Sequence, residues 1–448
     1  MNKYLISIIA LIILSFSSYS QVKDYDETAL LFSQERLNGS ARFMAMSGAF
    51  GALGGNLSAA EINPAGMAIF KYNAASISLD VQALENSNNF YNLNSVSKKT
   101  NLNFAQAGGL IIFNTNSKNW SKFTLSVNTS IANDYNQLIN LKGNSSITNE
   151  SYFLEPDPTA DLYSQVENQK MYNNAYGDNS KTTFTLATKY NDKTYFGFSV
   201  IGNSIDYNQE VVAVEGSKDI NDNTFNGRLN QNLRVIGQGI GFNFGVISIP
   251  VKGVRLGVSY QTPTWYNLTE EFNENMSVHL SNTSVTQPDN VDSVYEYRLR
   301  SPGKLTGSFA YVFGKEGLIS LDYNYKDYSK AKLSPTADFE TDFNYNQQIN
   351  KAYKAVSTLN IGGEYRLKYF SLRAGYHFET SPYVKDDNLD STQGYSLGFG
   401  FKTGNFSKLD FAFNQTNYLD KNRYLVAPKN IITNNLVNKF TVSYSIDF

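Results

Sequence analysis

The feature that most constrains the fold is a strict alternation of apolar and polar residues, which recurs from residue 74 to the last residue. Two clear examples are ISLDVQ at 77–82 and ISLDYNYK at 319–326. Successive side chains of an extended strand point to opposite faces, so a period of two gives each strand one apolar and one polar face. The sequence therefore predicts a chain made of amphipathic β-strands.

We count about fourteen such strands, and the segments that connect them alternate between short and long. The predicted strands are 74–85, 100–114, 122–135, 181–190, 194–207, 229–249, 253–268, 294–313, 317–330, 352–367, 370–381, 391–403, 407–419 and 435–448. Tight connections such as 191–193 and 314–316 alternate with long polar ones such as 86–99 and 136–180. Short periplasmic turns and long extracellular loops are typical of outer-membrane barrels. The predicted fold class is therefore all-β, a transmembrane antiparallel β-barrel of about 14 strands.

Other classes fit the sequence less well. A soluble two-sheet sandwich does not need such strict alternation, nor so many strands longer than the usual five or six residues. Cysteine is absent, which excludes a disulfide framework and a thiolate metal site. The 38 basic and 40 acidic residues give a net charge of −2 without a basic tract, so no nucleic-acid partner is expected.

A secretory signal peptide is predicted at residues 1–20. Lys3 supplies its charged region, an apolar run covers 5–16, and Ser18 and Ser20 are the small residues before cleavage near Ser20. An apolar run of this length is too short to span a membrane. The chain is therefore expected to be exported and to reside in the outer membrane of a Gram-negative bacterium.

The segment 38–70, NGSARFMAMSGAFGALGGNLSAAEINPAGMAIF, is apolar and rich in glycine, and it precedes the first predicted strand. Its glycines at 48–55 allow close backbone packing and positive φ angles, which disfavours an ordinary helix interior. An apolar segment of a secreted all-β protein has to be buried. The interior of the barrel is the natural place for it.

The same segment carries a family resemblance. Gly39-Ser40-Ala41-Arg42, the glycine-rich run 48–55 and Asn63-Pro64-Ala65-Gly66 resemble the N-terminal hatch of FadL/TodX-type outer-membrane transporters, in the form of that family's Bacteroidetes branch. The segments 299–305 and 317–323 give a second match. The resemblance implies that residues 21–73 form a hatch that plugs a barrel formed by 74–448. It also implies hydrophobic substrates, typified by long-chain fatty acids and aromatic hydrocarbons, which leave by hatch movement, often sideways through a gap in the wall.

Two sets of site residues follow from this resemblance and from the alternation. The hatch and gating candidates are Asn63, Pro64, Ala65, Gly66, Gly54 and Gly55. The ligand-binding candidates are Phe43, Met46, Phe50, Leu53, Arg255 and Arg373. The two arginines are expected to face the lumen, where a fatty-acid carboxylate would need a cation. For the apolar residues, packing of the plug is the alternative to contact with ligand.

No catalytic residue, metal site or cofactor is predicted. His377 is the only histidine expected to face the lumen, and nothing pairs it with a serine as in a hydrolase. The run 219–230 resembles a calcium loop, but Thr224 replaces the required glycine and Asn230 replaces the required glutamate. The chain is therefore not expected to be an enzyme.

The expected partners are a hydrophobic small molecule such as a fatty acid and the lipid of the outer membrane. The barrel assembly machinery is a further expected partner, because the chain ends in an amphipathic strand with the aromatic Phe448. We expect a monomer. The alternative function is a structural or receptor-type barrel that binds a macromolecule through long extracellular loops, chiefly 136–180.

Overall fold

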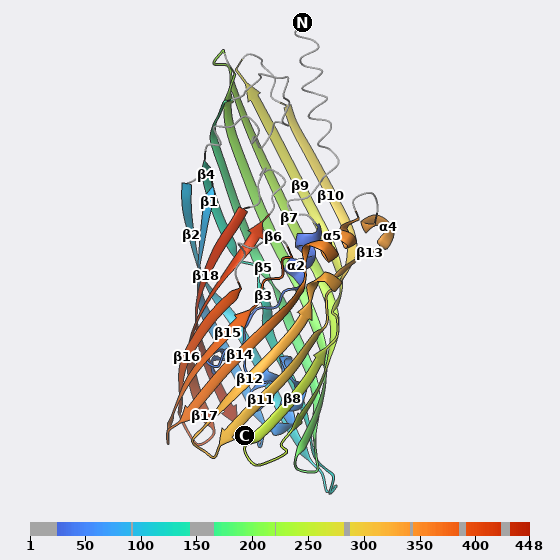
Figure 1. Ribbon diagram of the computed structural model, residues 1–448, viewed down its shortest axis with the longest axis vertical. Helices are drawn as coiled ribbons and strands as arrows, with labels where there is room; N and C mark the ends of the chain where they lie inside the picture. Colours follow the sequence, from blue (N-terminus) through green and yellow to red (C-terminus); the bar gives the residue numbers. More distant parts are fainter. Residues whose placement is uncertain are drawn as a thin grey trace.

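A closed β-barrel forms the body of the protein (Figure 1). The computed structural model describes residues 25–90, 93–143, 165–219, 221–281, 287–340, 344–384, 391–422 and 431–448, so the predicted signal peptide lies outside it. The described strands form one antiparallel sheet, which closes where β1 (Ala74–Phe90) pairs with β18 (Ile431–Asp447). Closure leaves the sheet without a free edge strand, as a sheet in lipid requires.

Eighteen strand segments make up fourteen barrel strands. The remaining segments are β2 (Leu93–Asn114), β3 (Trp120–Asp134), β4 (Gln137–Gly143), β5 (Gln165–Tyr190), β6 (Thr194–Lys218), β7 (Thr224–Ser248), β8 (Val254–Gln261), β9 (Trp265–Leu280), β10 (Gln287–Arg300), β11 (Lys304–Phe313), β12 (Gly317–Asp327), β13 (Lys332–Ser334), β14 (Ala355–Arg366), β15 (Phe370–Glu379), β16 (Thr392–Lys402) and β17 (Ser407–Asn422). Short bends interrupt four barrel strands, which consist of β3 with β4, β8 with β9, β10 with β11, and β12 with β13. The predicted fold class is confirmed.

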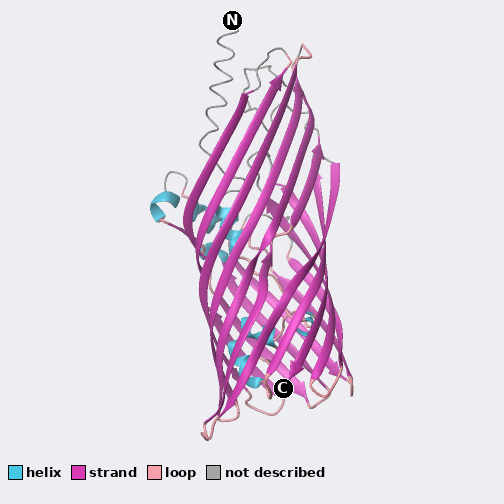
Figure 2. Cartoon of the chain, turned by 180° about the vertical axis from the view of Figure 1, so that it is seen from behind, coloured by secondary structure: helices cyan, strands magenta, loops and turns pink. Residues whose placement is uncertain are grey.

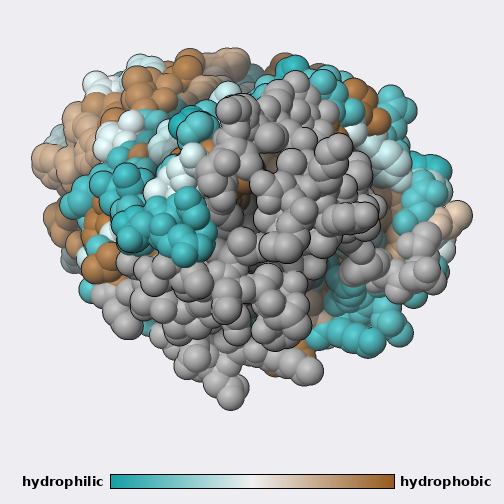
Figure 3. All heavy atoms as spheres, turned by 90° about the horizontal axis from the view of Figure 1, so that it is seen from above, coloured by the Kyte–Doolittle hydropathy of each residue, from teal (hydrophilic) through white to brown (hydrophobic). Residues whose placement is uncertain are grey.

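The two faces of the wall differ as the alternation predicts. On β1, Ile77 and Leu79 are 52% and 50% exposed on the outer face, whereas Ser78 and Asp80 are buried on the inner face. Figure 3, which looks down from above, shows apolar residues along the outer rim of the barrel. The apolar faces therefore point to lipid and the polar faces line the lumen.

Several strands extend much farther above the membrane than predicted. β5, β6 and β7 have 26, 25 and 25 residues, and Figure 1 shows them rising beyond the ends of β1 and β18. In this upper part the outer face is polar, with Asp206, Glu210, Arg228 and Arg234 exposed. The predicted loop 136–180 is therefore wrong in its bounds, because β4 and the first half of β5 occupy much of it.

The helices lie inside the barrel or, like α4, beside its wall about halfway up in Figure 1, and Figure 2 shows the lower ones within the strands. Four belong to the segment before β1: α2 (Tyr25–Ser33), α3 (Ala41–Met44), η1 (Leu57–Glu61) and η2 (Pro64–Ile69). The others are η3 (Tyr328–Lys330), α4 (Thr336–Phe339) and α5 (Tyr345–Ala352), which follow β12 and β13. No helix in the described part of the chain is long and apolar enough to cross a membrane.

Two apolar clusters fill the lumen at different heights. The lower one contains most of the hatch, from Ala41 to Ala68, together with wall residues such as Ile247. The upper one contains Leu30 and Phe32 of α2 and wall residues such as Leu233. β7 runs from the extracellular to the periplasmic end, so Leu233 lies above Ile247 on this strand. The cluster that contains Leu233 is therefore the upper one. The lumen is therefore closed by a hatch below and by an apolar cap around α2 above.

Candidate functional site

The glycine-rich run and the NPAG motif contact each other in the hatch. Gly54 has a φ of +57°, and a Cβ added to it would lie 2.5 Å from the carbonyl oxygen of Gly66. A Cβ on Gly66 would in turn lie 2.8 Å from the Cα of Gly54. Only glycine combines this backbone conformation with so close an approach. The sequence motifs therefore meet as one backbone-to-backbone contact.

Asn63 starts the helix η2 and fastens it to the wall. Its side-chain oxygen accepts a hydrogen bond from the N–H of Ala65 at 3.1 Å, and Pro64 occupies the first helical position, where a missing N–H costs nothing. The amide nitrogen of Asn63 donates to the carbonyl of Gly51 at 2.8 Å and to that of Val246 on β7 at 3.1 Å. This one side chain therefore joins the turn, the glycine-rich run and the barrel.

Glycines on the inner wall provide the surface against which the hatch packs. On each of six of them, an added Cβ would lie within 2.6 Å of a hatch atom. They are Gly197, Gly245, Gly257, Gly362, Gly375 and Gly398. They stand at lumen-facing positions of amphipathic strands. Sequence reasoning missed this set, although glycine at inward positions of several strands is a readable signal of close backbone approach.

We expect Gly362→Val to loosen the hatch and Gly363→Val to leave it unchanged. A Cβ at Gly362 would lie 2.5 Å from the carbonyl oxygen of Met46, whereas one at the neighbouring Gly363 would have 3.8 Å to its nearest atom. Hydrogen exchange of residues 41–50 in the purified protein is the measurement. Equal protection in the two variants would contradict this role of the inner-wall glycine.

An ion-pair cluster joins the hatch to the opposite wall. Arg42 of α3 binds Glu364 of β14 through two nitrogens, at 2.7 and 3.2 Å, and donates to the carbonyl of Gly55 at 3.1 Å. Arg373 of β15 donates to the same Glu364 at 2.7 Å and to Asp410 at 2.7 Å. Bidentate arginine–carboxylate pairs fix geometry as well as charge. The cluster therefore holds α3 in one orientation.

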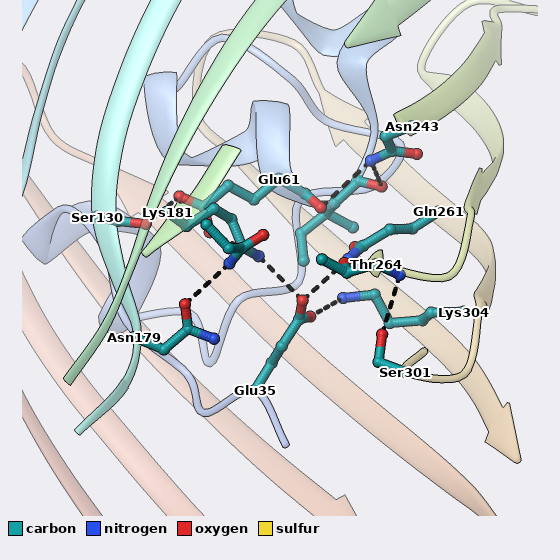
Figure 4. Close-up of polar contacts among 12 residues, drawn as sticks. Glu35, Glu61, Ser130, Asn179, Lys181, Asn243, Gln261, Thr264, Ser301 and Lys304 are labelled. Atoms are coloured by element: carbon teal, nitrogen blue, oxygen red, sulfur yellow. Dashed lines mark hydrogen bonds and ion pairs between the residues drawn. The ribbon is translucent and has the colours of Figure 1, made fainter. Parts of the chain in front are cut away.

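Above the hatch, residues 34–38 form an extended segment that we call the strap. Glu35 of the strap lies among donors from three wall strands, as Figure 4 shows. Its carboxylate oxygens are 2.6 Å from Lys304 Nζ, 3.2 Å from Lys181 Nζ and 2.9 Å from Gln261 Nε2. Burial alone would raise the pKa of Glu35, but Lys181 and Lys304 hold it well below its ordinary value. The strap is therefore anchored by a carboxylate that is ionised at neutral pH.

Glu35→Gln is expected to release the strap. Loss of a charge-assisted contact should speed amide exchange at Arg36 by about tenfold or more. The pKa of the Glu35 carboxyl is lower in the folded protein than in the unfolded chain, where it is about 4.3. The anchor is therefore complete above about pH 4.3 and is lost only as the pH falls toward the lower pKa of the folded protein. Protection of the wild-type strap should therefore be constant between about pH 7 and pH 5. The exposed Glu296→Gln is the control, and unchanged exchange at Arg36 in Glu35→Gln would contradict the anchor.

The barrel wall has a gap in its hydrogen bonding between β2 and β3. β2 pairs with β1 from Leu93 to Leu110. With β3 it pairs only in its lower part, from the pair Gln106 and Ser130 to the pair Asn114 and Lys122. Above this pair β3 bends inward, and the Leu138 N–H of β4 donates to Asn86 Oδ1 on the inner face of β1 at 3.2 Å. The upper part of β2 therefore has no pairing with β3 or β4 among the described residues.

The strap closes this gap from the inside. The Arg36 N–H donates to the carbonyl of Ala132 on β3 at 2.8 Å, which attaches the strap to β3. Asn38 Nδ2 lies 3.4 Å from the carbonyl oxygen of Ala105 on β2 and 3.2 Å from that of Ile131 on β3. One side-chain amide thus bridges the two strands at the point where they separate.

A chamber of about 190 Å³ lies beside the strap and above the hatch. Apolar residues from the strap, hatch and wall line part of it, including Leu37, Phe43, Ile131 and Val437. Polar and charged residues line the rest, including Glu35, Lys181, Lys304, Lys326 and Lys439. The chamber is therefore amphipathic and touches both the strap and the gap.

The predicted ligand residues lie in different parts of the structure. Phe43 lines the chamber, whereas Met46, Phe50 and Leu53 are buried in the hatch core. Arg255 donates to the Leu53 carbonyl at 2.6 Å, and Arg373 belongs to the Glu364 cluster. Arg255 thus holds the hatch, whereas Arg373 binds two carboxylates of the wall, Glu364 and Asp410. Contact of these six residues with ligand stays a prediction. Sequence reasoning missed the strap glutamate and the lysines of the chamber, which come from separate strands.

Comparison with known proteins gives a consistent result. The profile of a family described as Outer membrane protein transport protein (OMPP1/FadL/TodX) matches residues 164–444, more than half of the chain. The structure is similar to a Pseudomonas aeruginosa FadL homologue, with a TM-score of 0.58 and 14% identity over 93% of this chain and 100% of the other. It is similar to the Pseudomonas putida toluene transporter TodX (0.58, 15%, 93% and 100%) and to the CymD monoaromatic hydrocarbon channel (0.56, 15%, 92% and 98%). No curated protein sequence matches the chain.

Proposed function

Because the chain belongs to the OMPP1/FadL/TodX family of outer-membrane transport proteins, we propose that it takes up hydrophobic small molecules across the outer membrane. Long-chain fatty acids and aromatic hydrocarbons are the two substrate classes that we consider. The observation that carries the proposal is an amphipathic chamber beside a wall gap that a short strap closes. We also propose residues 21–73 as the hatch and 74–448 as the barrel after removal of 1–20.

The arrangement suits a solute that is poorly soluble in water. An open water-filled pore offers such a solute no favourable environment, whereas burial of its surface in the chamber contributes about 25 cal/mol per Å². Movement of the strap away from Ala132 and Ala105 would connect the chamber with the gap. The solute would then leave sideways between β2 and β3 into the membrane.

The hatch would complete this gate from below. Asn63-Pro64-Ala65-Gly66 and Gly54-Gly55 lie against each other and against β6 and β7, so a shift of either motif would disturb both. We propose that these residues keep the lower lumen closed while the strap opens. Water and ions would then stay excluded as the hydrophobic solute passes.

Uptake by whole cells tests the proposal. Cells that lack the protein and complemented cells are given radiolabelled oleate, radiolabelled toluene and, as a polar control, radiolabelled glycine. Faster entry of oleate or toluene into the complemented cells, with equal entry of glycine, is expected. If cells with and without the protein take up each of the three compounds at the same rate, the proposal is overturned. The ratio of oleate uptake to toluene uptake in the complemented cells decides between the substrate classes.

A further inference from the structure

One wall of the chamber carries mostly neutral hydrogen-bonding groups, beside two charged residues, Lys326 of β12 and Glu379 of β15. The neutral groups come from the strands β12 and β14 to β17 and are Asn324, Thr358, Asn360, His377, Thr392, Asn414 and Thr416. A lumen that served only to pass hydrocarbons would gain nothing from such a wall, because each polar group loses hydrogen bonds when an apolar molecule covers it. The wall therefore indicates a ligand with polar atoms of its own.

Two of these groups have unused hydrogen-bonding atoms. His377 and Asn414 are 7% and 4% exposed, and neither His377 Nδ1 nor Asn414 Nδ2 has a hydrogen-bond partner in the part of the chain that the structure describes. Thr416 connects the two side chains, since its hydroxyl lies 3.5 Å from His377 Nε2 and 3.4 Å from Asn414 Oδ1. The free atoms thus belong to one connected group. Buried polar atoms are normally paired, so two unpaired atoms on residues that line the chamber point to a ligand. Both atoms are buried, so a ligand would reach them after a rotation of each side chain.

Gly394 makes room for this arrangement. It stands on β16 directly between His377 of β15 and Thr416 of β17 in the sheet register. A Cβ at this position would lie 2.1 Å from His377 Cε1. The imidazole therefore occupies the place of the missing side chain, which brings it within reach of the group on β17.

The cations of the chamber, by contrast, already have partners, including Arg36, which lies 3.9 Å from Asp420 and over the ring of Tyr418. Lys181 and Lys304 bind Glu35, and Lys326 Nζ donates to the carbonyl of Ser33 at 2.6 Å. Lys439 Nζ lies 3.4 Å from Asn38 Oδ1 and 3.7 Å from Asp80. A carboxylate would have to displace one of these contacts, and the loss of a buried ionic partner is expensive. An uncharged oxygen of a ligand would not have to displace any of these ionic contacts.

We propose that His377 and Asn414 form a subsite for the uncharged oxygen of an amphiphile, a hydroxyl or a carbonyl group. A hydroxyl is chemically suited to either free atom, because it accepts from the Asn414 amide or donates to an unprotonated imidazole nitrogen, whereas a carbonyl only accepts from the amide. The hydrocarbon part would lie along the apolar residues of the same chamber, such as Phe43 and Val437. This inference rests on the proposed function and narrows its substrate class.

Binding of a chain-matched series tests the subsite. Tritiated dodecanol, dodecanoate and dodecane are bound to the full-length protein in nanodiscs by scintillation proximity, with empty nanodiscs as the background. We expect wild type to bind dodecanol more tightly than the other two. His377→Phe and Asn414→Leu should each weaken dodecanol binding by about tenfold and leave dodecane unchanged. Asn417→Leu, on the exposed face of the same strand as Asn414, is the control.

Each outcome of this series decides the inference. His377→Gln retains a hydrogen-bonding side chain and should recover part of the dodecanol affinity, and heat-modifiable migration on gels checks that every variant is folded. Equal binding of dodecanol and dodecane, tighter binding of dodecanoate, or an equal loss for all three probes would overturn the subsite. If one of these results is obtained but the protein still speeds the uptake of oleate or toluene by whole cells, only the subsite is overturned and the proposed function stands. Failure of both uptake and binding overturns both.

Discussion

Removal of residues 25–70 is expected to turn the protein into an open pore, with a single-channel conductance in planar bilayers about tenfold or more above that of the wild type. These residues supply the lower plug and the strap, and they contribute α2 to the upper cap. The barrel closes through its own strand pairs, from β1 to β18, so most of its wall keeps its hydrogen bonds without the plug. The exception is the gap between β2 and β3, which the strap bridges. The inner face that becomes exposed is polar and would fill with water.

A shorter truncation separates the hatch from the cap. Deletion of α2 alone, residues 25–33, leaves the strap and the hatch in place and should raise the conductance only slightly. The two deletions are compared in the same bilayers, with heat-modifiable migration on gels as the check that both barrels are closed. If the longer deletion conducts no better than the shorter one, the segment 38–70 is not the plug of this barrel.

The fourteen strands could be predicted because lipid enforces the alternation. Where the wall faces lipid, as at Ile77 and Leu79, the outward residues are mostly apolar, and the inward ones are polar except where the wall packs against the hatch. Above the membrane this constraint ends: outward residues such as Asp206 and Arg228 are polar, whereas inward ones such as Leu233 pack into the upper apolar cluster. The outward faces there carry few of the apolar residues that identify a membrane-facing strand. The upper halves of β5 to β7 therefore resemble loops in the sequence, which explains why their strands are longer than the alternation predicts.

The candidate site could be predicted only where its residues are neighbours in sequence. The hatch is one continuous segment with its own glycine and NPAG motifs, whereas the chamber combines the strap with strands from β3 to β18. Arg373 shows the same limit of prediction from the sequence. Alternation turns Arg373 inward, but only the strand register places it opposite Glu364 and two strands from Asp410. A charge expected to meet ligand is therefore already neutralised by the wall.

Glu364→Gln is expected to destabilise the hatch more than any other single change at the hatch–wall contact. The carboxylate is 2% exposed and lies between Arg42, Arg366 and Arg373. Its neutralisation removes the counter-charge of Arg42 and Arg366 and leaves the buried Arg373 with Asp410 alone. Breaking a comparable buried pair costs about 3–5 kcal/mol. Hydrogen exchange of residues 41–69 in the purified protein measures the effect. Glu316→Gln, at an exposed periplasmic turn, is the matched control and should change nothing.

A double-mutant cycle with Arg42→Gln shows whether the loss acts through the hatch. Arg42 is the member of the cluster that the hatch contributes, and it binds Glu364 through two nitrogens. If this pair holds α3, the double variant should lose much less protection than the sum of the single variants, with a coupling of about 1–3 kcal/mol. Strictly additive losses would mean that Glu364 stabilises the wall through Arg366 and Arg373 alone. The hatch would then be held by its close contacts with the inner-wall glycines, and Gly362→Val would be the more damaging change.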